Sequence, residues 1–212
     1  MIAAIPGQSD LASIVSILGQ LKEGLAQLVA EENIGGELQV ERWETGSLLV
    51  FLWLKTMAAV ELVGKALKGA AIVYQEIQKG RILGQHVDLL KEHVREKKIK
   101  NEVAEVLGEA QKQLINQIVE REARVVEDAF FDAHDNERLL RIQNSIRLLA
   151  DLFDKGTTVY PALEMPKEKR DVFPDLKELG TFLSPLKELK EGDGKKDDAA
   201  ESASDEGQSA PA

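Results

Sequence analysis

The stretch "ETGSLLVFLWLK", residues 44–55, decides how the rest of the chain is interpreted. Residues 47–54 hold seven large apolar side chains and directly follow "ELQVERWE", residues 37–44, in which apolar and polar side chains mix. Alternation is typical of a strand with one buried face, whereas a short apolar run after a turn is typical of a strand buried on both faces. Thr45 and Gly46 can form the connection. The pattern predicts a β-hairpin at about residues 37–54.

A helix is the alternative for residues 47–54, but their aromatic and β-branched side chains favour a strand. A two-stranded hairpin alone is marginally stable, and its edges offer unpaired backbone groups. We expect an N-terminal helix and a helix from Thr56 to cover its faces. A further strand, from residues 159–160 or from another subunit, is expected to pair with the free edge of residues 47–54.

The composition predicts a mainly α-helical protein around this small N-terminal hairpin. The chain has 212 residues, of which 43% are hydrophobic and only 5% aromatic, and no proline occurs between Pro6 and Pro161. Because a proline inside a helix costs roughly 3 kcal/mol, a run of this length without one permits long helices.

The first helix carries a seam of apolar side chains. Ser9 or Asp10 can cap it, and Gly35 and Gly36 can end it. The apolar positions recur at alternating steps of three and four: Leu11, Ile14, Leu18, Leu21, Leu25 and Leu28. This spacing fits either a coiled coil with another chain or one amphipathic helix packed on its own domain, and we favour the second.

Further helices follow. From residue 56 to 79 the polar side chains occupy one narrow sector, so that helix has little surface for solvent. Gly80 and Gly84 predict a break or kink before a helix from residue 82 to about 98. Residues 99–131 and 137–153 carry apolar side chains at helical spacing around a turn sequence, which predicts a pair of long antiparallel helices.

The chain divides into three regions. Residues 1–155 form the predicted helical domain with its hairpin. Residues 156–190 contain three prolines between 161 and 174 and predict an extended segment followed by short helices. Residues 191–212 hold seven acidic residues and two lysines without large apolar side chains, which predicts a disordered acidic tail.

No pattern in the chain predicts catalysis or a bound cofactor. There is no cysteine, and the zinc-protease, P-loop, dinucleotide-binding and nucleophile-elbow motifs do not occur. The densest polar cluster, "EDAFFDAHDNE" at residues 127–137, is interpreted as a solvated turn rather than a metal site. His86 and His93 lie about 10.5 Å apart along a helix and cannot share one zinc ion. We therefore expect no enzyme, no cofactor and no metal.

The charge of the chain argues against nucleic acid as a partner. The formal net charge is −10, and the only basic cluster, "KEHVREKKIK" at residues 91–100, is partly neutralised by Glu92 and Glu96. Nucleic-acid binding depends on neutralising phosphates with Lys and Arg. The start of the chain lacks the basic region of a secretory signal, and no uncharged apolar stretch of 18 residues occurs. We expect a cytoplasmic protein.

These features predict a non-catalytic structural or protein-interaction protein, either a homo-oligomer or an adaptor, that associates through its helices or its hairpin edge. The alternative is a membrane-associated or pore-forming protein that uses the apolar region 47–74. The candidate interaction residues are the apolar positions of the helical seams and of the buried strand: Leu11, Ile14, Leu18, Leu21, Leu25, Val50, Leu52, Leu139, Ile142 and Ile146.

Overall fold

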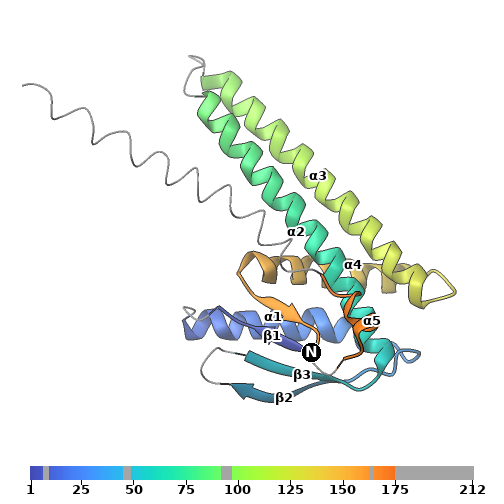
Figure 1. Ribbon diagram of the computed structural model, residues 1–212. Helices are drawn as coiled ribbons and strands as arrows, with labels where there is room; N and C mark the ends of the chain where they lie inside the picture. Colours follow the sequence, from blue (N-terminus) through green and yellow to red (C-terminus); the bar gives the residue numbers. More distant parts are fainter. Residues whose placement is uncertain (7–9, 45–48, 92–96, 163–164, 175–212) are drawn as a thin grey trace, which may run out of the picture. The chain divides into compact units, whose positions relative to one another are not determined.

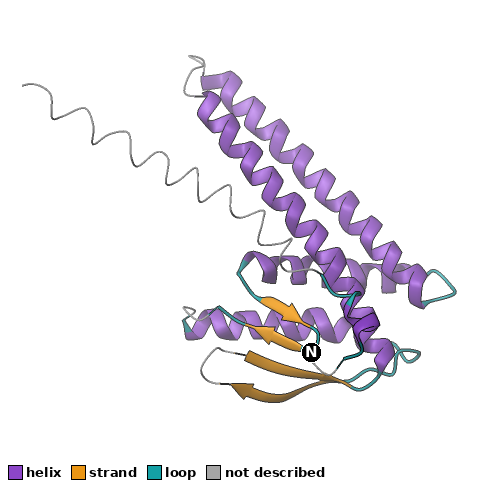
Figure 2. Cartoon of the chain, in the orientation of Figure 1, coloured by secondary structure: helices purple, strands orange, loops and turns teal. Residues whose placement is uncertain are grey.

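The computed structural model describes residues 1–6, 10–44, 49–91, 97–162 and 165–174 (Figure 1). In these ranges helices account for most of the chain and the strands for a small sheet (Figure 2), so the predicted mainly α fold class is confirmed. The predicted disordered tail and the short helices expected between 175 and 190 lie outside the described residues. The elements are β1 (Ile2–Ala4), α1 (Leu11–Val29), β2 (Leu38–Glu44), β3 (Leu49–Leu54), α2 (Met57–Lys91), α3 (Lys97–Phe130), α4 (Asn136–Asp154), β4 (Thr158–Tyr160) and the single turn α5 (Lys167–Arg170).

The predicted hairpin is present as β2 and β3. The two strands pair antiparallel, with Leu38 opposite Leu54 and Val40 opposite Leu52. The register shifts between Val40 and Arg42, as in a β-bulge. Residues 45–48, which contain the predicted turn, are outside the described ranges.

The free edge of β3 is covered by a strand that the sequence did not reveal. The sheet order is β2-β3-β1-β4, so β1 lies between β3 and β4. Ala3 stands opposite Val50 on one side and opposite Val159 on the other. Residues 159–160 therefore do join the sheet, but the expectation that they or another subunit pair directly with β3 is wrong. β1 has only three residues, too few for the period of a strand to show in sequence.

The connections give the sheet a split βαβ arrangement. β1 and β2 both run antiparallel to β3, and β3 and β4 both run antiparallel to β1. β1 is therefore parallel to β2, with β3 between them, and β3 is parallel to β4, with β1 between them. α1 connects β1 to β2, and α2, α3 and α4 connect β3 to β4. Because crossovers of this kind are almost always right-handed, both sets of helices fall on the same face of the sheet. α1 contacts β2, and α2 contacts β3.

The core lies between that face and the helices. The side chains of Val50, Leu52 and Leu54 are buried there, as are Ala3 and Val159 from the neighbouring strands. The largest buried side chains of the helices come from α1, α2, α3 and α4: Leu25, Leu28, Leu62, Leu67, Val119, Ile146, Leu149 and Leu152.

α2 and α3 form the long antiparallel pair and lie side by side (Figure 1). α2 continues as a helix to Lys91, so the predicted break at Gly80 and Gly84 is wrong. Neither glycine has the positive φ that would end a helix, and Gly80 lies against the side chain of Gln111 in α3. A helical glycine costs about 1 kcal/mol relative to alanine, which the packing of a long helix can offset.

The helices predicted at 99–131 and 137–153 are present as α3 and α4, but their packing differs from the prediction. The long helix that packs along α3 is α2, not α4 as predicted. α4 contacts α1, α2 and α3. Asp135 precedes α4 and caps it, because its side chain accepts hydrogen bonds from the backbone N–H groups of Glu137 and Arg138. Asp135, which the sequence pattern assigned to a turn, therefore acts as the N-cap of a helix.

Candidate interaction surfaces

The sheet has a second face, opposite the core, that is mostly apolar. Side chains alternate along a strand, and residues opposite one another in an antiparallel pair share a face. Leu49, Phe51 and Trp53 therefore point away from the buried Val50, Leu52 and Leu54, and Trp53 is 44% exposed. Ile2 stands opposite Phe51, and Tyr160, 41% exposed, stands opposite Ile2. We call this set the open face: Ile2, Leu49, Phe51, Trp53 and Tyr160.

Charged groups of both signs border the open face. The guanidinium of Arg42 on β2 lies 4.0 Å from the ring centroid of Phe51, a cation–π contact that holds it over the sheet. Lys55, just after β3, lies 4.0 Å from Glu37, just before β2, and both side chains are more than half exposed. A face of this kind, with Trp, Tyr and Arg around apolar side chains, has the composition of protein-binding hot spots.

The structure places the ten predicted interaction residues in two groups. Seven of them are buried in the core: Leu21, Leu25, Val50, Leu52, Leu139, Ile142 and Ile146. Contacts within this chain account for their apolar character, and α1 packs on α4 as an amphipathic helix does. The other three lie near the start of α1, where Leu11 is 77% exposed and Ile14 and Leu18 are half-buried. Their contact with another chain stays a prediction.

The open face escaped the sequence analysis because it depends on strand pairing. Phe51 and Trp53 were assigned to a strand buried on both faces. A strand from residues 159–160 was expected directly beside them, but the place of Ile2 between Phe51 and Tyr160 was not foreseen. The signal that could have found it is the spacing of two aromatic side chains at positions i and i+2 of one strand.

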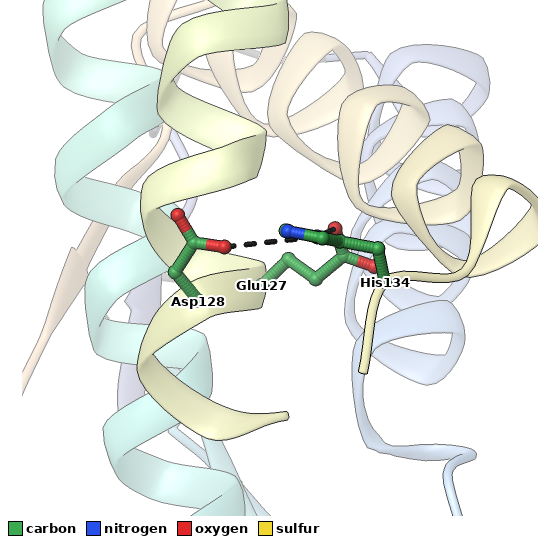
Figure 3. A group of neighbouring side chains, drawn as sticks. All are labelled: Glu127, Asp128 and His134. Carbon is green, nitrogen blue, oxygen red and sulfur yellow. Dashed lines mark hydrogen bonds and ion pairs between the residues drawn. The ribbon is translucent and has the colours of Figure 1, made fainter. Parts of the chain in front are cut away.

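A second candidate is the polar cluster at the turn between α3 and α4 (Figure 3). Within the described part of the chain, Glu127, Asp128 and His134 each offer one atom that could bind a metal, and these atoms lie within 4.8 Å of one another. The His134 Nδ1 atom is 3.1 Å from Glu127 Oε2 and 3.8 Å from Asp128 Oδ1. Asp128 and His134 are exposed, but Glu127 is only 1% exposed, so the interpretation of this cluster as a solvated turn is wrong for Glu127.

The buried carboxylate of Glu127 holds the turn together. It accepts a hydrogen bond from the backbone N–H of Asp135 at 3.0 Å and one from Arg138 Nε at 3.3 Å. Arg138 in turn stacks on Phe131, with 4.1 Å from its guanidinium carbon to the ring centroid. A cation bound here would have to share Glu127 with the positive charge of Arg138, so the geometry supports a structural role better than a metal site.

The pKa of Glu127 reflects this competition. Burial by itself would raise the pKa of the carboxyl. The hydrogen bonds from Asp135 and His134 and the charge of Arg138 outweigh burial, and the pKa of Glu127 lies below its ordinary value. Glu127 is therefore ionised at neutral pH and is suited to bind Arg138 rather than to transfer a proton.

A third polar group joins α2 to the end of α4. Arg81 donates to both oxygens of Asp154, at 2.5 and 2.8 Å, and Gln78 donates to the same carboxylate at 3.0 Å. The hydrogen bond from Arg81 lowers the pKa of Asp154 despite partial burial. Burial raises the pKa of the nearby Tyr74. Each charged group here has an opposite partner, as expected of a structural ion pair.

Two further polar features of the described residues carry no candidate site. A surface pocket of about 430 Å³ lies at the start of α1 and is lined by Asp10, Ser13 and Lys155 among others. Asp10 caps the helix through the N–H of Ser13, and Lys155 binds Gln20 and Asp151, so neither charge is left for a ligand. His86 is exposed on α2, and His93 is outside the described residues.

Comparisons with known proteins add one relative. No family model matches this chain, and no solved structure matches it. The chain is similar to the "Uncharacterized protein YqaP" of Bacillus subtilis (strain 168), with 22% identity over 171 residues. These residues make up 81% of this chain and 55% of that protein, so the chain spans about half the length of the relative.

Proposed function

We propose that this chain is a non-catalytic protein that works through contacts with other protein chains and associates with itself. The open face of the sheet carries the proposal. A four-stranded sheet usually buries one face on its helices, and its other face is polar when it meets water. Here the second face presents Ile2, Leu49, Phe51, Trp53 and Tyr160, and β2 adds Gln39 and Arg42 opposite Trp53 and Phe51.

The occupant best suited to this face is a second copy of the chain. The face is apolar at its centre, and its rim pairs cations with anions, as Lys55 does with Glu37. A two-fold stack of two such sheets would bury the apolar centres against each other and leave rim charges of both signs near the opposite rim.

Single-stranded nucleic acid can also stack on aromatic side chains of an open sheet, but the charges here favour protein. Such sites combine the aromatic platform with a positively charged groove. Arg42 and Lys55 are accompanied at this rim by Glu37 and the exposed Glu41, and the whole chain carries −10. A labelled single-stranded oligonucleotide is therefore expected to stay unbound at physiological salt.

Membrane association is the weaker alternative. Much of the apolar region 47–74 is buried in the core of this chain, which accounts for its composition without lipid. None of the helices in the described ranges is long and apolar enough to cross a membrane. Flotation with anionic vesicles tests this alternative directly, because protein recovered with the vesicles would favour lipid over a second copy.

Self-association is tested by light scattering with matched surface variants. The wild-type chain, of 23.4 kDa, is expected to show a mass above that of a monomer at tens of micromolar. Trp53→Lys should weaken association by about 2 kcal/mol, roughly 30-fold in Kd, because it replaces an exposed aromatic side chain of the open face by a charge. Leu140→Lys, at a 58% exposed position of α4, is the control and should leave the mass unchanged.

Tryptophan fluorescence adds an independent measurement. The chain has two tryptophans, so in a Trp43→Phe variant the emission reports on Trp53 alone. Dilution from tens of micromolar should shift this emission to the red as Trp53 returns to water. A wild-type chain that is monomeric at tens of micromolar, with an emission that does not change on dilution, would contradict the proposal.

A further inference from the structure

The packing of two glycines of α2 fixes its register against α3. Gln111 of α3 lies against Gly80, and Glu122 of α3 lies against Gly69. Eleven residues separate the two positions on each helix, so both contacts belong to one antiparallel register. Because every residue of a helix adds the same rise, this register also tells which positions are level farther along the pair.

Two further glycines lie at one level of the pair. Gly84 of α2 is level with Leu107, the neighbour of Gly108 in α3, and this level is about 6 Å beyond the contact of Gly80 with Gln111. A Cβ atom at Gly84 or at Gly108 would meet nothing within 4 Å, so close packing does not require glycine at either position. Glycine weakens a helix relative to alanine, and here no packing contact offsets that loss. Both helices are therefore weakened at the same level.

The packing of the pair changes close to this level. On the side of the core, Tyr74 and Gln78 of α2 are buried, as are Ile118 and Val119 of α3. In the other direction, the side chains that the structure describes are all exposed or half-buried: residues 81–86, 102 and 105–110. A segment with few buried contacts is less stable than the core and changes conformation more readily.

We propose that the α2–α3 pair has a joint at Gly84 and Gly108, about which residues 85–91 and 97–107 bend together as one arm. α2 and α3 are continuous at these glycines, so the joint is a bend of intact helices and not the break that the sequence predicted. Hinges are a few residues that absorb changes in φ and ψ, and bends within helices occur at glycines among other causes. Such an arm can adjust its direction to a bound protein while the core stays unchanged. The inference concerns one copy of the chain and does not depend on self-association.

Distances between spin labels test the joint, since the chain has no cysteine of its own. One label is placed at Leu140, an exposed position of α4. The other is placed either at Glu102 in the arm or at Gln113, which lies between the joint and the core, and both positions are exposed. Labelled chain is mixed with an excess of unlabelled chain, so that only distances within one copy are measured. The distance from Glu102 to Leu140 is expected to be more widely distributed than the distance from Gln113 to Leu140.

Alanine substitutions show whether the glycines cause this width. In a Gly84→Ala/Gly108→Ala double variant, the distribution measured from Glu102 should narrow to about that measured from Gln113, since alanine is the better helix former and nothing obstructs it. Gly19→Ala in α1 is the matched control, because a Cβ atom there also meets nothing within 4 Å. It should leave the width unchanged.

Two results would overturn the joint. The first is a distribution from Glu102 that is as narrow as the one from Gln113 in the wild-type chain, or that stays wide in the double variant. The second is an absence of hydrogen-exchange protection in residues 85–91 and 97–107, because the arm would then unfold rather than bend. Neither result bears on the light-scattering test of self-association.

Discussion

Glu127 connects two helices through one carboxylate. It lies near the end of α3, is 1% exposed, and binds Asp135 and Arg138 beyond the turn. A buried charge without a partner is costly, so loss of either Glu127 or Arg138 would leave the other buried charge unpaired. The exposed Asp128, the next residue in the helix, has no comparable burial.

Glu127→Ala should destabilise the fold strongly. The change leaves Arg138, whose side chain is 11% exposed, without its carboxylate, and breaking a buried pair typically costs about 3–5 kcal/mol. Asp128→Ala is the matched control at an exposed site and should stay within about 0.5 kcal/mol of the wild type. The free energy of unfolding in urea measures both, and equal stability of the two variants would contradict the role given to Glu127.

The effect of Glu127→Gln should depend on pH. The pKa of Glu127 is lowered in the folded chain, so the carboxylate contributes stability above the pKa of the unfolded chain, near 4.3. That contribution is lost as the pH falls through the folded pKa. Urea unfolding at pH 7 should therefore separate wild type from Glu127→Gln, and the difference should shrink below about pH 4. A constant difference from pH 7 to pH 3 would show that the charge does not contribute.

At the scale of elements, the glycines of α2 and α3 divide into two kinds. Gly84 and Gly108 have open space around them, and a Cβ atom there would meet nothing within 4 Å. Gly64 in the first half of α2 is different, because a Cβ atom would come within 2.6 Å of Val172 and 3.2 Å of Phe173. The segment after α5 packs on α2 only because this position has no side chain.

Gly84→Ala and Gly108→Ala should each stabilise the α2–α3 pair by about 0.5–1 kcal/mol, since alanine is the better helix former and nothing obstructs it. Gly64→Ala should instead destabilise the chain by about 1–3 kcal/mol through overpacking. Hydrogen exchange, read by mass spectrometry on peptides of α2 and α3, measures the first effect, and thermal unfolding measures the second. A stabilising Gly64→Ala would show that residues 172–173 are not packed there.

At the scale of the whole molecule, one core joins the sheet to the helices, so a single substitution in β3 tests the fold. Val50 is fully buried and stands opposite Ala3 and Trp43 in the neighbouring strands. Val50→Asp buries an unpaired charge and should cost about 4 kcal/mol or more, enough to unfold the chain. Trp53→Lys changes the same strand on its other face and should stay folded by circular dichroism. A soluble, folded Val50→Asp would overturn the assignment of the core.

The positions of the helices and strands could be predicted from the sequence, but which of them pack or pair with one another mostly could not. The hairpin and the helices could be predicted because periodicity and turn residues are local signals. The place of β1 beside β3 could not, because three residues carry no period and pairing is set by contacts distant in the chain. For the same reason the polar residues at 127–137 could be assigned to a turn, but the burial of Glu127 depends on Arg138 and Phe131 packing around it. The open face depends on strand order and was missed with it.

The central position of β1 also shapes how the chain reaches this fold. β1 can pair with β3 as soon as about fifty residues have been made, but its other edge waits for β4, where Ala3 meets a residue 156 positions later in the chain. Closing a loop of that length slows folding more than it lowers final stability. During synthesis the nascent sheet therefore keeps an unpaired inner edge until α2, α3 and α4 have been made. A chaperone or an early contact with another chain would protect the protein most in that interval.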